Sequence, residues 1–236
     1  MATVDAILFD KDGTLFDFHA TWGSWAKRFL LDICAGDVLR ARGLAAAARF
    51  DFDRARYLPD SPLISSTPGQ IAACLIPHLP EFTSQLLIER MNVLSADAEQ
   101  VAATPLAPLL SELRGRALKL GVVTNDSLGS TELHLRRAGV AGLFDRMLGC
   151  DSGFLPKPEP DMLLAFCEFV DVEPANVAMV GDSPGDLIAA KRAGMVPVAV
   201  LTGPVGREAL EPDAEVVLPS IAQIPAWLDG AQTKAA

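Results

Sequence analysis

Two short segments carry paired aspartates at a spacing that suits phosphoryl transfer. Asp10 and Asp12 stand two positions apart in FDKDGTL, and Asp182 and Asp186 lie in GDSPGD. Side chains two positions apart in an extended chain project from the same side, so Asp10 and Asp12 can reach one ligand. One carboxylate can then attack phosphorus while the other handles the proton of the leaving group.

Other residues near these aspartates suit a phosphate ligand. Gly13 allows the backbone to turn sharply where amides must approach phosphate. Thr124, in VVTN, supplies a hydroxyl donor, and Lys157, in GFLPKPEP, supplies a positive charge for the phosphoryl oxygens. Asp182 adds negative charge that a cation would relieve. Because every potential ligand atom is oxygen, the pattern predicts Mg²⁺ as the cofactor.

Alternating strands and helices must position these residues. Nonpolar runs predict the strands, and 3.6-residue periodicity predicts the helices. We expect strands at 4–9, 120–124, 144–149, 177–180, 196–201 and 216–218, and helices at 106–117, 127–138, 160–170 and up to 193. This alternation predicts an α/β fold with a doubly wound parallel sheet. Ligands of such sheets bind beyond the carboxyl ends of the strands, which is where these motifs fall.

The stretch from 18 to 102 has a different pattern. It contains no convincing strand, its nonpolar residues recur at helical spacing, and prolines divide it into short helices. We therefore predict two parts, a catalytic core formed by 1–16 and 103–236 and an inserted helical cap formed by 17–102.

Net charge, the length of the nonpolar stretches and the cysteine pattern argue against several classes of protein. The chain has 236 residues and a formal net charge of −10, which disfavours nucleic acid and anionic membranes as partners. Its longest nonpolar stretches fall short of the roughly 20 residues that cross a bilayer. The four cysteines form no C-x-x-C pair, and no signal-peptide pattern precedes the first expected strand. We therefore expect reduced thiols and a cytoplasmic location.

In their order and spacing, FDKDGTL, VVTN, the isolated Lys157 and GDSPGD resemble the four motifs of the haloacid dehalogenase-like hydrolase superfamily. The insertion between the first two motifs is similar in position to the cap of the phosphoglycolate phosphatase-like branch. The resemblance implies a phosphatase for a small phosphate ester, in which Asp10 forms an aspartyl-phosphate. Asp12 would protonate the leaving oxygen and then activate water.

The resemblance also implies a ligand set. Asp10, the backbone carbonyl of Asp12, and Asp182 would hold Mg²⁺, with Asp186 binding directly or through water. Gly13, Thr14, Thr124, Asn125 and Lys157 would bind phosphate. Other interpretations exist for single residues: Thr124 and Asn125 as a helix cap, Lys157 as an exposed loop residue, Asp186 as a first-turn acid. His19, where the chain enters the cap, is a possible substrate contact or a hinge residue. We expect Trp22 and Trp25 to pack inside the cap.

The motifs separate activities within the superfamily. Dehalogenases and phosphonatases of this kind lack the second aspartate, so Asp12 argues against both. Mutases of the β-phosphoglucomutase type more often carry valine or isoleucine where this chain has Thr14, so Thr14 favours hydrolysis. A phosphosugar mutase and a non-catalytic phosphate-binding regulator stay as alternatives. Phosphoglycolate is the leading substrate by fold analogy alone. The sequence determines neither the substrate nor the oligomeric state.

Overall fold

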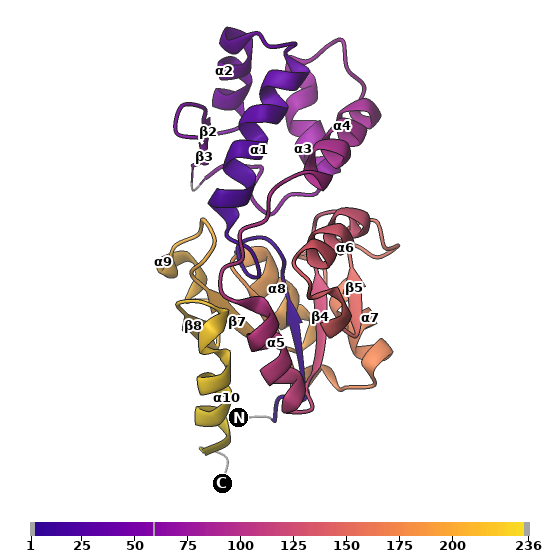
Figure 1. The fold of residues 1–236 in the computed structure, drawn as a ribbon, viewed down its shortest axis with the longest axis vertical. Helices are drawn as coiled ribbons and strands as arrows, with labels where there is room; N and C mark the ends of the chain where they lie inside the picture. Colours follow the sequence, from indigo (N-terminus) through magenta and orange to yellow (C-terminus); the bar gives the residue numbers. More distant parts are fainter. Residues whose placement is uncertain (1–2, 59, 234–236) are drawn as a thin grey trace.

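A six-stranded sheet forms the centre of the computed structural model, which describes residues 3–58 and 60–233 (Figure 1). Every neighbouring pair of strands is parallel. Across the sheet the strands are β5 (Arg146–Leu148), β4 (Lys119–Val123), β1 (Ala6–Phe9), β6 (Val177–Gly181), β7 (Val196–Val200) and β8 (Val216–Leu218). The predicted doubly wound parallel sheet is confirmed, and each predicted strand is present.

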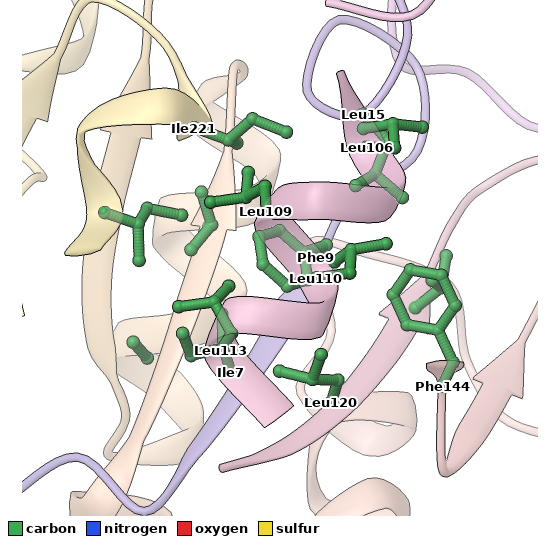
Figure 2. Packing of buried hydrophobic residues seen from close by; sticks show 14 of the residues in the cluster. Ile7, Phe9, Leu15, Leu106, Leu109, Leu110, Leu113, Leu120, Phe144 and Ile221 are labelled. Atoms are coloured by element: carbon green, nitrogen blue, oxygen red, sulfur yellow. The ribbon is translucent and has the colours of Figure 1, made fainter. Parts of the chain in front are cut away.

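β1 lies inside the sheet and is fully buried, which explains its unbroken nonpolar sequence. Its side chains alternate between the two faces. Ile7 and Phe9 pack with the leucines of α5 (Leu106–Gly115) and with nonpolar residues of α10 (Ile224–Thr233). Figure 2 shows these leucines lying over Ile7 and Phe9.

The opposite face of the sheet has its own cluster of nonpolar side chains. Ala6 and Leu8 of β1 pack there with α7 (Asp161–Val170) and α8 (Pro184–Ala193). The remaining elements of this part are α6 (Leu128–Arg137), α9 (Arg207–Leu210) and three 3₁₀ turns, η2 (Ala141–Leu143), η3 (Pro174–Asn176) and η4 (Ile221–Gln223). Helices on both faces are what a buried parallel sheet requires. No helix among the described residues is both long and nonpolar enough to cross a membrane.

The inserted segment is helical and has a hydrophobic core separate from that of the sheet. Its helices are α1 (Phe18–Ile33), α2 (Val38–Ala47), α3 (Pro68–Leu75) and α4 (Ser84–Ala96), with the 3₁₀ turn η1 (Ile76–His78) after α3. Figure 1 shows this segment at one end of the sheet, beyond the carboxyl end of β1. The expectation of no strand here was wrong, because β2 (Phe50–Asp51) and β3 (Arg56–Tyr57) form a short antiparallel hairpin.

The two connections between the insertion and the sheet run side by side. The Asp17 amide donates to the Val101 carbonyl at 2.7 Å, and the Ala103 amide donates to the Leu15 carbonyl at 3.0 Å. Phe16 also forms an antiparallel bridge with Ala102. The chain therefore leaves and re-enters the sheet domain at one paired junction.

Candidate active site

The loop after β1 is tightly shaped around Asp182. Gly13 has φ +86°, a left-handed conformation, and a Cβ at this position would lie 2.3 Å from Asp182 Oδ2. The Thr14 hydroxyl donates to Asp182 Oδ1 at 3.3 Å, and the Thr202 hydroxyl donates to the Gly13 carbonyl at 2.6 Å. Only glycine satisfies both the backbone angle and the close approach at position 13.

Lys157 is buried between two carboxylates. Its ammonium donates to Asp10 Oδ1 at 2.7 Å, to Asp186 Oδ1 at 2.5 Å and to the Val123 carbonyl at 3.0 Å. These contacts join the carboxyl ends of β1, β4 and the start of α8. Burial alone would lower the pKa of Lys157, but the charges of Asp10 and Asp186 outweigh it and raise the pKa. Lys157 is therefore a permanent cation in the site.

Asp186 combines a structural and a site position. Its Oδ2 accepts from the amide and hydroxyl of Ser183 at 3.0 and 2.6 Å, which closes a capping box at the start of α8. Its Oδ1 faces Lys157. The two interpretations of this residue from sequence, helix-terminal acid and site residue, therefore describe different oxygens of one carboxylate.

Three buried carboxylates, those of Asp10, Asp182 and Asp186, offer ligand atoms within 4.8 Å of one another. Burial is the main cause of the raised pKa values of Asp10, to about 7, and of Asp182. Asp186 raises both pKa values further, and Lys157 opposes the rise. When all three carboxylates are ionised, one lysine leaves the cluster with excess negative charge, and the raised pKa values of Asp10 and Asp182 reflect this. An all-oxygen donor set with excess negative charge fits a divalent cation such as Mg²⁺.

Thr124 and Asn125 follow β4 and are both buried. The Thr124 hydroxyl accepts from the Asp126 amide at 3.1 Å. The Asn125 amide group donates to the carbonyls of Ser65 and Lys157 at 2.8 and 3.0 Å, and its oxygen accepts from the Lys157 amide at 3.0 Å. Both amide hydrogens of Asn125 are thus engaged by backbone, and the side chain links the lysine loop to the inserted segment.

Lys11 is fully buried beside Asp12. Its ammonium lies 3.0 Å from Asp12 Oδ2, 2.9 Å from Asp126 Oδ2 and 3.1 Å from His134 Nδ1. The other ring nitrogen of His134 lies 2.9 Å from the carbonyl of Ser95, on α4. Asp12 Oδ1, by contrast, is buried and has no hydrogen-bond partner among the described residues. Lys11 therefore holds Oδ2 of Asp12, while Oδ1 is available to a ligand.

A cavity of about 230 Å³ lies between the strand ends and the inserted segment. Of the predicted site residues, six line it: Asp10, Asp12, Thr124, Asn125, Lys157 and Asp186. Gly13, Thr14 and Asp182 are buried behind this wall and contact one another, as described above. His19 is absent from the lining and packs edge-on against Phe18.

The two tryptophans pack in the insertion as expected and also reach the cavity wall. Trp25 belongs to the core of the insertion, where it stacks on Phe29 with ring centroids 5.2 Å apart, and Trp22 packs against that core. Both also line the cavity.

Sequence reasoning missed several neighbours of the site. Thr202 and Gly203 follow β7, and a Cβ on Gly203 would lie 1.8 Å from Asp182 Oδ2. Their position after a strand was a usable signal, because the same rule located the other motifs. Lys11 and His134 gave no such signal. Their partners come from α6 and α4, which are distant in sequence.

Comparison with known proteins gives consistent matches. Residues 4–194 match the family model described as haloacid dehalogenase-like hydrolase. A phosphoglycolate phosphatase of Psychrobacter arcticus is 36% identical over 80% of each chain. Validoxylamine A 7'-phosphate phosphatase of Streptomyces hygroscopicus subsp. limoneus is 29% identical over 92% of this chain and 94% of its own. A haloacid dehalogenase-like hydrolase structure from Bacteroides fragilis superposes with a TM-score of 0.74, covering 94% of this chain and all of its own at 17% identity.

Proposed function

The chain belongs to the haloacid dehalogenase-like hydrolases and is of their phosphatase type, and from that premise we propose that it hydrolyses a small phosphate monoester with Mg²⁺, through a phosphoryl group carried on Asp10. The observation that carries the proposal is the Asp10–Lys157 contact of 2.7 Å in the wall of the cavity. A phosphoryl group seated there would meet a carboxylate oxygen and a permanent cation together.

Asp10 attacks phosphorus in this scheme, and the bond from phosphorus to the leaving oxygen breaks. Lys157 and the Thr124 hydroxyl stabilise the negative charge on the phosphoryl oxygens. Asp12 gives the leaving oxygen a proton. Water then attacks phosphorus and gives a proton to Asp12, while the bond between the Asp10 oxygen and phosphorus breaks and inorganic phosphate leaves. The side chain of Asp12 supports this role. Asp12 lines the cavity, its Oδ2 pairs with Lys11, and its buried Oδ1 has no hydrogen-bond partner among the described residues and is available for proton transfer.

Asp10, Asp182 and the backbone carbonyl of Asp12 would hold Mg²⁺, which would offset the excess negative charge when bound. Asp186 fits a position one water further out, because its two oxygens already accept hydrogen bonds from Lys157 and Ser183. Gly13 and Thr14 would act through Asp182, whose carboxylate they contact, rather than on phosphate directly. His19 stays a prediction without support from the cavity lining.

We also propose that residues 17–102 act as a cap that closes over the substrate and excludes water. The paired junction near Phe16 and Ala102 supports a hinge at this point, since it is the crossing between two separate cores. Asn125 would hold the closed state through the Ser65 carbonyl.

The test is hydrolysis of 4-nitrophenyl phosphate with and without Mg²⁺. We expect activity that EDTA removes and that Asp10→Asn abolishes while the protein stays folded by circular dichroism. Activity that survives Asp10→Asn or is insensitive to EDTA would contradict the proposal. Incubation with a sugar 1-phosphate separates the mutase alternative, which would yield the 6-phosphate isomer, from a phosphatase, which yields inorganic phosphate.

A further inference from the structure

The inserted segment gives the cavity an aromatic and nonpolar wall. Four aromatic side chains line it, those of Phe18, Trp22, Trp25 and Tyr57. Leu63, Pro68, Ile71 and Met91 add further nonpolar surface. Since the phosphoryl group would lie at Asp10 and Lys157, this wall faces the alcohol part of the ester.

Charge is confined to the strand-end side of the cavity. Among the described lining residues, Lys157 is the one cation, and it is already paired with two carboxylates. The lining residues of the insertion are all uncharged; the polar ones are Ser65, Ser66, Gln70, Asn92 and Ser95, beside the Tyr57 hydroxyl. A carboxylate or second phosphate on the leaving group would be buried here without a countercharge, which is unfavourable.

Two buried polar atoms of this wall have no hydrogen-bond partner among the described residues. They are the indole Nε1 of Trp25, a donor, and the Oδ1 of Asn92, an acceptor. Trp25 is 6% exposed and both residues line the cavity. A hydroxyl group both donates and accepts, so a ligand that carries hydroxyl groups can offer partners to both atoms. A buried polar atom without a partner destabilises the protein, and a bound hydroxyl group would remove that cost.

We propose that the substrate is the phosphate monoester of an uncharged ring alcohol that carries further hydroxyl groups, with the ring on the tryptophan wall and hydroxyl groups as the partners of Trp25 Nε1 and Asn92 Oδ1. This inference rests on the proposed phosphatase function and names its substrate class. A cavity of about 230 Å³ suits one ring, since sites for drug-sized ligands begin near 300 Å³. Because the leaving group must be uncharged, the proposal excludes 2-phosphoglycolate and pyrophosphate as preferred substrates.

The first experiment compares kcat/KM over two groups of probes with Mg²⁺ present. The neutral probes, whose leaving group is uncharged, are glucose 6-phosphate, ribose 5-phosphate and inositol 1-phosphate. The anionic probes, whose leaving group carries a carboxylate or phosphate, are 2-phosphoglycolate, 3-phosphoglycerate and pyrophosphate. We expect the best neutral probe to exceed every anionic probe by at least about tenfold, the effect of one poorly paired polar group. An anionic probe that exceeds all neutral probes overturns the inference.

4-Nitrophenyl phosphate separates the two claims. If it is hydrolysed while an anionic probe is preferred, the substrate inference is wrong and the proposed function stands. If neither it nor any other ester is hydrolysed, the proposed function fails and the substrate inference fails with it.

The second experiment removes the proposed hydroxyl contacts singly. Trp25→Phe keeps a ring for stacking on Phe29 and removes the N–H, and Asn92→Leu removes the acceptor. We expect each variant to lower kcat/KM for the best neutral probe about fivefold to tenfold more than it lowers kcat/KM for 4-nitrophenyl phosphate, which has no hydroxyl group to lose a contact. Trp227→Phe is the matched control, because Trp227 packs against the sheet core and not the cavity. Equal losses on both substrates, or no loss on either, would overturn the inference.

Discussion

The ammonium of Lys11 lies 3.0 Å from Asp12 Oδ2, and the lysine side chain is fully buried. The same ammonium lies 3.1 Å from His134 Nδ1. Because an ammonium can only donate, Nδ1 must accept, and the proton of the ring then sits on Nε2 and is donated to the Ser95 carbonyl. A chain of contacts thus runs from the predicted acid–base residue to α4 of the inserted segment.

Lys11→Met tests whether this lysine holds Asp12 in position. The change leaves Asp12 and Asp126 near each other without their shared cation. We expect a loss of about 3–5 kcal/mol in the free energy of unfolding, as for other buried pairs with one partner removed. We also expect kcat to fall by at least about tenfold, because the proton-transfer geometry is lost. Urea unfolding and steady-state kinetics measure the two effects.

Lys119→Met provides the control for that change, since Lys119 is exposed at the start of β4. Its free energy of unfolding should change by no more than about 0.5 kcal/mol. If Lys11→Met behaves like Lys119→Met in stability and in kcat, Lys11 does not position Asp12.

His134 should make stability depend on pH. Burial, followed by the charge of Lys11, lowers its pKa below 6.5, while Asp12, Asp126 and the Ser95 carbonyl oppose this. Between the lowered pKa and about 6.5 the unfolded chain binds the proton more readily than the folded chain, so stability falls as pH decreases through this window. Urea unfolding at pH 7.5 and pH 5.5 should show a larger loss for the native protein than for His134→Gln. Equal losses would show that His134 does not titrate in this way.

Asp182→Asn should lower the stabilisation by Mg²⁺ without lowering the stability of the metal-free protein. Without divalent metal, Asp182→Asn should be at least as stable as the native protein, because one of three neighbouring carboxylates is neutralised. At about one hundred times its dissociation constant, Mg²⁺ should stabilise the native protein by about 2.7 kcal/mol. Asp182→Asn should lose most of that gain, and Glu168→Gln, on an exposed position of α7, should keep it. Thermal unfolding with EDTA or Mg²⁺ measures this, and a full gain in Asp182→Asn would remove Asp182 from the metal site.

Asn125→Ala should loosen the lysine loop and the insertion together. It removes the hydrogen bonds to Lys157 and to the Ser65 carbonyl. The backbone groups of the buried Lys157 lose their partner, at about 1–3 kcal/mol in stability. We expect kcat to fall about tenfold, because Lys157 is less firmly placed. Asn176→Ala removes one exposed hydrogen bond to Asp5 and should change kcat by less than about twofold. A kcat unchanged in Asn125→Ala would show that Asn125 does not organise the site.

The sheet was predictable because its strands are buried on both faces. A run such as Ala6–Phe9 is nonpolar throughout and ends abruptly at Asp10, which marks both the strand and its functional end. The motifs of Asp10, Thr124 and Asp182 could be located by the same rule, since each follows a strand. Helix ends were also readable, for example at Gly194, which caps α8 in a left-handed conformation.

Other features depend on packing that the sequence does not display. Lysine is almost never fully buried unless it is paired, and the partners of Lys11 come together only when the loop after β1 meets α6 and the turn before it. The hairpin of β2 and β3 pairs two residues on each side, too few for an alternating pattern to appear. The tryptophans could be assigned to the insertion core from helical spacing, but their place in the cavity wall depends on how the insertion sits over the sheet.

The central claim is that Asp10 carries the phosphoryl group, and the most direct measurement is chemical capture of that group. Asp12→Asn is mixed with Mg²⁺ and ³²P-labelled 4-nitrophenyl phosphate, whose leaving group departs without a proton, and the reaction is quenched in acid. Without the Asp12 carboxylate, water should hydrolyse the intermediate slowly. Peptide mapping should place the label on Asp10, and the Asp10→Asn, Asp12→Asn double variant should carry none. Label on another residue, or rapid turnover by Asp10→Asn without any label, would contradict the account.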